Sequence, residues 1–170
     1  EAGFQVTLHA KHAPTYVSDA TEKDILALLS AAAASGNAQL GGFSATLQTL
    51  LDTRQVVVAS DPWWLLPDFW SGMPAALSAE LSTAAMVIVK GDLNYRRAVR
   101  DSVWPLSVGP LHAAGLRQSG SPLSDTPILL LRTCKSDTLA PAGSPRVAEL
   151  DRGSPGWRTS GRYGMAQLIN

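Results

Sequence analysis

Two short runs of consecutive apolar residues, 56–58 and 86–89, constrain the fold of this chain more than any other feature. Strands with one face in water alternate apolar and polar residues, whereas continuously apolar strands are typical of mostly parallel sheets covered on both faces. Helical patterns alternate with these runs along the chain, which favours helices packed on both sides of such a sheet. The predicted fold class is therefore α/β, with three α/β/α layers and a mostly parallel sheet of four to five strands.

The expected elements follow from this periodicity and from helix-end signals. Thr21 and Asp24 have the spacing of a capping box, and Gly36 is typical of a helix end, so the first helix is expected between them. Pro74 suits the first turn of a third helix. Strands are expected at 4–10, 55–59, 85–90, 127–133 and 165–169, helices at 21–36, 43–51, 74–81 and 93–99, and irregular chain at 105–126 and 140–156.

Charge and length exclude several classes of protein. Fourteen Lys and Arg residues balance fourteen Asp and Glu residues, so no overall field attracts nucleic acid or an anionic membrane. No apolar run approaches the roughly 20 residues that cross a bilayer, and no signal peptide is visible. The 170 residues suit one domain, 1–170, and the single cysteine, Cys134, fits a cytoplasmic location, with the nucleus as a second compartment. The chain also has no initiator Met and starts just before a strand, which is typical of a fragment.

Polar side chains follow each of the four main strands. In an open parallel sheet, ligands bind beyond the carboxyl ends of the strands, so these polar clusters are expected to converge on one edge. The four clusters are 16–19, 60–64, 90–96 and 132–137.

The cluster at 90–96 has the clearest logic for binding an anion. Gly91 lets the backbone turn sharply into a helix whose first N–H groups face the ligand, and Arg96 could add a charge-assisted hydrogen bond to phosphate. Asp92 has two interpretations, because an aspartate at the start of a helix is more often an N-cap than a functional group. The spacing leaves Asn94 and Tyr95 undecided.

Lys135 and Asp19 also have both a functional and a structural interpretation. Lys135 follows a strongly apolar strand, so its ammonium group suits a phosphate at the sheet edge, although a solvated lysine is the simpler interpretation. Asp19 could be a hard oxygen ligand for Mg²⁺ or Mn²⁺, or it could help Ser18 to cap the following helix. One carboxylate does not make a metal site.

Several other conspicuous residues favour structural roles. His9 and His12 lie three apart in an extended segment, so they point to opposite faces and do not suit a shared metal. Cys134 has no recognisable base partner, which argues against a nucleophile. The segment 105–126 could be a mobile lid or a surface loop. An aromatic cluster is expected in the core or a pocket wall, because its acidic neighbours do not suit nucleic acid: Trp63, Trp64, Phe69 and Trp70.

Four segments form an ordered set: 11–19 (KHAPTYVSD), 89–96 (VKGDLNYR), 131–137 (LRTCKSD) and 157–164 (WRTSGRYG). They resemble motifs of the damage-control phosphatase family, also known as domain of unknown function 89. The resemblance covers essentially the whole chain and matches the C-terminal portion of the family's catalytic domain. The subgroup is the eukaryotic one described as sugar phosphate phosphatases and also as protein-glutamate O-methyltransferases.

The resemblance implies a fold, an activity and a set of site residues. Members of the family have an α/β/α core with a helical N-terminal region. They hydrolyse phosphate monoesters, including fructose 1-phosphate and fructose 6-phosphate, with Mn²⁺, Co²⁺ or Ni²⁺ in preference to Mg²⁺. By resemblance, Asp19 is a metal ligand and Asp92 is a catalytic residue. The small-molecule phosphate monoester is contacted by Asp92, Leu93, Asn94, Tyr95, Arg96 and Lys135.

The chain departs from the family pattern at its beginning. Family members place a D-N-A-G-F-E segment upstream of the first strand, and its Asp and Asn are metal ligands. This chain starts after that segment, so we expect weak cation binding and little activity of the chain alone, although a full-length relative is a phosphatase. Two alternatives stay open: an S-adenosylmethionine-dependent protein-glutamate O-methyltransferase, for which no glycine-rich cofactor turn is visible, and a non-catalytic fragment.

Overall fold

The chain has an α/β fold whose residue contacts divide it into two compact units, Glu1–Leu66 and Pro67–Asn170. A computed structural model describes residues 3–14, 19–116 and 122–169. The α/β class is confirmed, but the described strands form two small sheets, one in each unit, where we predicted one sheet. Among the described residues, no helix combines the length and apolarity required of a membrane span.

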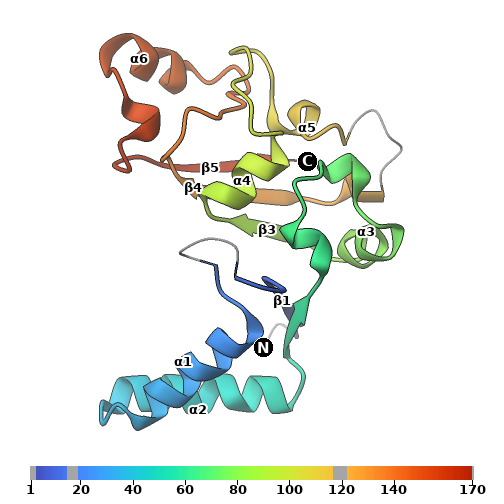
Figure 1. Ribbon diagram of the computed structural model, residues 1–170, viewed down its shortest axis with the longest axis vertical. Helices are drawn as coiled ribbons and strands as arrows, with labels where there is room; N and C mark the ends of the chain where they lie inside the picture. The colour runs from blue at the N-terminus through green and yellow to red at the C-terminus, as the bar shows by residue number, and fades with distance from the viewer. Residues whose placement is uncertain (1–2, 15–18, 117–121, 170) are drawn as a thin grey trace. The chain divides into compact units, whose positions relative to one another are not determined.

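The first unit consists of two helices on one face of a two-stranded parallel sheet (Figure 1). Strands β1 (Val6–Ala10) and β2 (Val56–Ser60) pair from Val6 opposite Val56 to Ala10 opposite Ser60. Between them lie α1 (Glu22–Ala34) and α2 (Ala38–Asp52), and the 3-10 turn η1 (Pro62–Leu65) follows β2.

The caps of α1 and α2 explain where the helices begin. The predicted capping box of α1 is confirmed, since the Thr21 N–H and hydroxyl both donate to the Asp24 carboxylate at 2.8 Å. These bonds lower the pKa of Asp24. The α2 helix begins at Ala38 rather than at residue 43, because the Asn37 side chain accepts from the N–H groups of Gln39 and Leu40.

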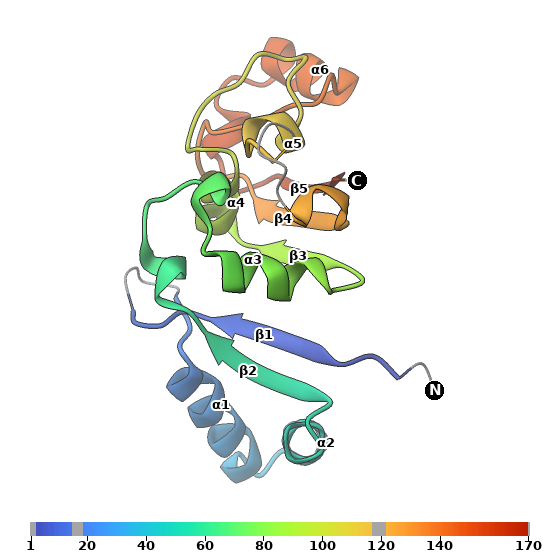
Figure 2. The same cartoon turned by 90° about the vertical axis from the view of Figure 1, so that its right-hand side faces the viewer.

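The second unit is built around a three-stranded sheet with β4 in the centre (Figures 1 and 2). Strand β3 (Val87–Lys90) runs parallel to β4 (Ile128–Thr133), and β5 (Gly164–Ile169) runs antiparallel to it. Helices α4 (Asp92–Ala98) and α5 (Pro110–Ala113) contact the sheet. The other elements are η2 (Trp70–Gly72), α3 (Ala75–Ser82), η3 (Pro122–Asp125), α6 (Pro145–Gly153) and η4 (Trp157–Thr159).

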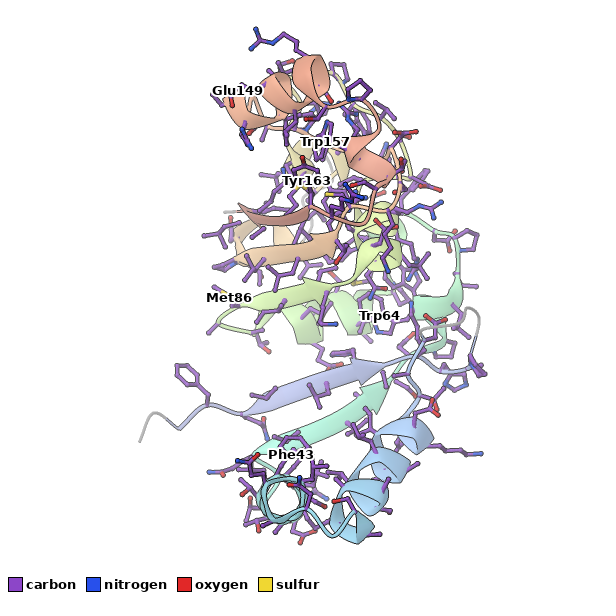
Figure 3. All side chains as sticks on the ribbon, turned by 90° about the vertical axis from the view of Figure 1, so that its left-hand side faces the viewer. Phe43, Trp64, Met86, Glu149, Trp157 and Tyr163 are labelled. Atoms are coloured by element: carbon purple, nitrogen blue, oxygen red, sulfur yellow. The ribbon has the colours of Figure 1, made fainter. Side chains whose placement is uncertain are left out.

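The two faces of this sheet differ in burial. Val89, Ile128 and Leu130 point to the covered face and are at most 8% exposed. On the opposite face, Ile88 and Leu168 flank Leu129 in one row and are 60% and 56% exposed, and Met86 projects at the start of β3 (Figure 3). The prediction that the continuously apolar strands are covered on both faces is therefore wrong for β3, because apolarity does not show how many faces a neighbour covers.

The two segments expected to be irregular contain folded structure. In 140–156, Ser144 caps α6 by accepting from the Val147 N–H, and Pro145 occupies the first turn. In the described part of 105–126, Ala113, Leu116 and Leu123 are at most 1% exposed. These side chains belong to the core, whereas Leu106 is 44% exposed, so the described part of the segment is core at Ala113, Leu116 and Leu123 and surface at Leu106.

Replacing Gly91 by Ala should destabilise the second unit by about 1–3 kcal/mol. Gly91 has a backbone φ of +106°, which residues with a side chain rarely adopt. Nothing lies within 4 Å of an added Cβ, so the cost is backbone strain rather than a clash. Gly153→Ala is the matched control, since it also meets open space but has no positive φ. Urea unfolding followed by tryptophan fluorescence measures both variants; equal midpoints would contradict the prediction.

Candidate active site

The turn between β3 and α4 carries the KGDLNYR motif. Gly91 donates its N–H to the Leu131 carbonyl of β4 at 2.8 Å and is itself the N-cap residue of the seven-residue helix α4. Asp92 is the first residue of the helix, one position after the N-cap. The N-cap interpretation of Asp92 is therefore wrong, because glycine occupies that position and the carboxylate is used elsewhere.

The Asp92 carboxylate pairs with a buried arginine of the neighbouring strand. Arg132 Nη2 lies 2.5 Å from Asp92 Oδ1, and the two side chains are 1% and 18% exposed. Within the described residues, Asp92 Oδ1 and Arg132 Nε are buried polar atoms without a hydrogen bond. The Asp92 carboxylate thus balances the charge of Arg132, and its oxygens can still accept hydrogen bonds.

Tyr95 packs inside this site. Its side chain is 0% exposed, and Arg132 lies over its ring at 4.6 Å. The hydroxyl donates to Gln167 Oε1 at 3.1 Å and accepts from the Ala140 N–H at 3.0 Å, and burial raises its pKa. A direct substrate contact by Tyr95 stays a prediction. In this structure its side chain joins α4 to β5 and to the chain at Ala140.

Arg96 is held by a carboxylate on the next turn of chain. Its Nε and Nη2 bind the two Asp101 oxygens at 2.6 and 2.7 Å, a bidentate geometry that adds rigidity. Asp101 also accepts from the Thr138 hydroxyl at 2.8 Å. The hydrogen bonds from Arg96 are the main cause of the lowered pKa of Asp101. The Nε and Nη2 donors of Arg96 are therefore bound to Asp101, so only other N–H groups of its guanidinium could bind a ligand.

Lys135 lies on a loop, 134–138, that is fixed on both sides. Before it, Cys134 donates its N–H to the Tyr163 carbonyl at 2.8 Å and accepts from the Gly161 N–H at 2.9 Å. After it, Arg132 binds the Ser136 and Thr138 carbonyls. The Lys135 side chain is exposed, and no ion pair involves it among the described residues.

The closing WR-x-SG motif supports the same loop. Arg158 Nη1 donates to the Asp137 carbonyl at 3.4 Å, and Arg158 Nε and Nη2 donate to the Asp151 carboxylate of α6. The Trp157 ring packs edge-on against Tyr163 with centroids 5.7 Å apart, and both are seen beside α6 in Figure 3. The motif thus acts as a scaffold for the loop that carries Lys135.

The remaining predicted contacts, Leu93 and Asn94, lie on the first turn of α4 and are half-buried. Asn94 Nδ2 donates to the Lys90 carbonyl at 2.9 Å. The structure therefore brings Asp92, Leu93, Asn94, Tyr95 and Arg96 onto one short helix, and the Asp92–Arg132 pair connects that helix to the Lys135 loop.

Asp19 belongs to the first unit, where it is half-buried just beyond β1. The Lys11 N–H donates to the Ala20 carbonyl at 2.9 Å, which holds the chain next to Asp19. The rest of its predicted cluster, 16–18 with Ser18, lies outside the described residues. No group of three His, Cys, Asp or Glu residues that could hold a metal occurs in the part of the chain that the structure describes. The described residues therefore do not by themselves fit the expected divalent cation.

The other conspicuous residues of the first unit have structural contacts. His9 Nδ1 accepts from Trp64 Nε1 at 3.3 Å, and the His12 ring lies 3.4 Å from the Ser60 hydroxyl. The Trp63 ring packs edge-on against Trp64, with centroids 5.0 Å apart. In the second unit, Trp70 is 3% exposed and Phe69 stacks under the Arg100 guanidinium. These contacts agree with the structural interpretation of the histidines and of the aromatic cluster.

The sequence placed Arg132 in the polar cluster 132–137 but gave it no role, and it did not indicate Asp101 or Thr138 as parts of the site. Arg132 had a visible signal, because it is two residues beyond Leu130 and so shares the covered face of β4 with Ile128 and Leu130. A charged side chain on a buried face requires a partner. Thr138 and Asp101 gave no comparable signal, since their contact depends on the path of two loops.

The chain resembles known proteins over nearly its whole length. The family model of the Damage-control phosphatase ARMT1-like domain matches residues 1–150. The chain belongs to this family. Relatives named Damage-control phosphatase ARMT1 are 29% identical in Rattus norvegicus over 171 residues and 29% identical in Homo sapiens over 170 residues. These alignments cover 99% and 98% of this chain but 38% and 37% of the relatives, so the chain spans less than half the length of the ARMT1 proteins that it matches.

Asp92→Ala should lower the free energy of unfolding of this ARMT1-like chain by about 3–5 kcal/mol, because it leaves the Arg132 charge buried and unpaired. Glu149→Ala is the control, since its pair with Arg146 is exposed and should contribute less than about 1 kcal/mol. Urea unfolding of both variants tests this, and similar losses would show that the Asp92–Arg132 pair has no special weight.

The thiol of Cys134 should be nearly inert in the native protein. Its side chain is 2% exposed, and burial raises its pKa, so it stays protonated at neutral pH. We expect labelling by a disulfide reagent to be at least about a hundredfold slower in buffer than in denaturant. Rapid stoichiometric labelling of the folded chain would reopen the nucleophile hypothesis.

Proposed function

We propose that this chain carries the substrate-binding part of a metal-dependent phosphoric monoester hydrolase of the damage-control phosphatase family, acting on sugar phosphates such as fructose 1-phosphate and fructose 6-phosphate. The observation that supports this most is the 2.5 Å Asp92–Arg132 pair. It joins the helix of the KGDLNYR motif to the end of β4 in the LRTCKSD motif, so two separate motifs contribute side chains to one place.

The ion pairs of the site favour Lys135 as the phosphate-binding cation. Arg96 and Arg132 are each paired with a carboxylate, Asp101 and Asp92. Lys135 is exposed and has no such partner among the described residues. Its ammonium group is a compact charge that can bind the oxygens of a phosphate monoester.

Asp92 and Asn94 suit the sugar part of the substrate. Asp92 remains 18% exposed although its Oδ1 is buried, so the rest of the carboxylate can accept a hydrogen bond from a sugar hydroxyl. Asn94 lies two residues later on the same turn, with an amide that can donate and accept. In this proposal Asp92 is the catalytic residue, and Leu93 and Tyr95 shape the site beside it.

The proposed cation is Mn²⁺, Co²⁺ or Ni²⁺, with Asp19 as one oxygen ligand. Hard cations need several oxygens arriving together, and the described residues contain no group of three candidate ligands. In this proposal the other ligands come from residues outside the described ones. We expect the 170-residue chain alone to bind the cation weakly and to turn over little substrate, whereas we expect a full-length relative to be an active phosphatase.

Lys135→Ala should raise KM for fructose 1-phosphate by about 10- to 100-fold in the complete protein, because a charge-assisted hydrogen bond to phosphate is lost. The assay is Mn²⁺-dependent release of phosphate. Arg146→Ala removes an exposed cation of α6 and should leave KM unchanged. An unchanged KM for Lys135→Ala would remove Lys135 from the site.

Asp19→Ala should abolish Mn²⁺-dependent turnover and weaken Mn²⁺ binding measured by calorimetry, because one oxygen ligand is lost. Asp52→Ala removes an exposed carboxylate of the same unit and serves as the control. Calorimetry with S-adenosylmethionine separates the phosphatase from the methyltransferase alternative. Binding of that cofactor, without release of phosphate from either sugar phosphate, would favour the methyltransferase and overturn the phosphatase proposal.

A further inference from the structure

Arg132 is a charged side chain in an apolar position of the sheet. It lies on the covered face of β4 with Ile128 and Leu130, and its side chain is 1% exposed. Taking a guanidinium out of water is costly unless ion pairs and hydrogen bonds replace the lost solvation. Neighbouring groups must therefore pair with the Arg132 guanidinium, and these partners show which segments it holds together.

The partners of Arg132 come from separate segments. Nη2 reaches Asp92 at 2.5 Å on α4, and it also donates to the Ser136 carbonyl and hydroxyl at 3.1 Å. Nη1 donates to the Thr138 carbonyl at 2.5 Å, and the guanidinium plane covers the Tyr95 ring. A planar fork can hold these groups at once, whereas a lysine ammonium is a single point that cannot reach them all.

Arg132 holds the chain just after Lys135 without contacting Lys135 itself. Ser136 and Thr138 follow Lys135, and the backbone of Cys134 before it is fixed by Gly161 and Tyr163. The Thr138 hydroxyl continues the network to Asp101. The position of Lys135 on its loop therefore depends on the same guanidinium that holds the Asp92 carboxylate.

We propose that Arg132 is the positioning residue of this site: its guanidinium sets the separation between the Asp92 carboxylate and the Lys135 ammonium by binding Asp92 and the backbone of 136–138 together. The catalytic consequence rests on the proposed phosphatase function. Arg132 itself does not contact substrate, since it has almost no exposed surface.

Arg132→Lys tests the proposal because it keeps the charge and loses the fork. In the complete protein, we expect Arg132→Lys to lower kcat/KM for fructose 1-phosphate by about 10- to 100-fold, mainly through KM. In a Lys135→Ala background the same substitution should cost less than about threefold, because Arg132 acts through the Lys135 loop. A merely structural role would give the same loss in both backgrounds. Arg146→Lys is the control and should change neither kcat/KM nor KM.

Ser136→Ala covers the case in which Arg132→Lys fails to fold. It removes only the Ser136 hydroxyl that accepts from Arg132. We expect a loss of about threefold in kcat/KM that disappears in the Lys135→Ala background. A wild-type KM in Arg132→Lys, or additive losses in both double variants, would overturn the proposal.

Amide hydrogen exchange tests positioning without any substrate. The N–H groups of Leu139 and Ala140 bind the Ser102 carbonyl and the Tyr95 hydroxyl, directly after the loop that Arg132 holds. In Arg132→Lys, or in Ser136→Ala to a smaller degree, they should exchange about tenfold faster than in the wild type, while amides of α6 keep their rates. Unchanged exchange at both amides overturns the positioning role. Absence of phosphatase activity in the wild-type protein would instead overturn only the proposed function.

Discussion

The burial of one guanidinium constrains how β4, α4 and the loop 134–138 fit together. Arg132 occupies a position on the covered face of β4, beside Ile128 and Leu130, and the surrounding chain supplies a counter-charge and two carbonyl oxygens for it. Asp92 supplies the charge from the start of α4, and the loop after β4 supplies the oxygens. The strand, the helix and the loop are therefore fixed by a shared electrostatic requirement. Apolar packing alone would allow the helix and loop to shift past one another.

This requirement also explains how motifs far apart in the sequence form a site. The turn at Gly91 places α4 beside β4, since Gly91 donates to Leu131 just before Arg132. The WR-x-SG segment then holds the other end of the Lys135 loop through Arg158 and Gly161. Each family motif described in this unit thus either carries an exposed side chain, such as Lys135, or holds in place the chain that carries one. The division between exposed Lys135 and buried Arg132 follows from this arrangement.

Much of the fold could be predicted from the sequence, and much of the site could not. All five strands lie within two residues of the expected positions, because apolar runs and turn residues are local signals, and the Thr21–Asp24 box is also local. Local signals did not reveal that β3 has an open face, that Ser144 starts another helix, or that the strands divide between two sheets. The resemblance named Asp92, Lys135 and the other candidate contacts. It did not reveal the Asp92–Arg132 pair, which depends on the register of neighbouring strands.

The Tyr95 hydroxyl is completed by Gln167, which follows it by 72 residues. During synthesis, α4 must therefore leave the ribosome well before the glutamine that satisfies its buried phenol exists. Such long-range closure delays folding, since most of the loop entropy is lost before the contact forms. Until β5 docks, β4 has an unpaired edge that could join the strand of another nascent chain. The contact that closes the site therefore forms late in the synthesis of this chain.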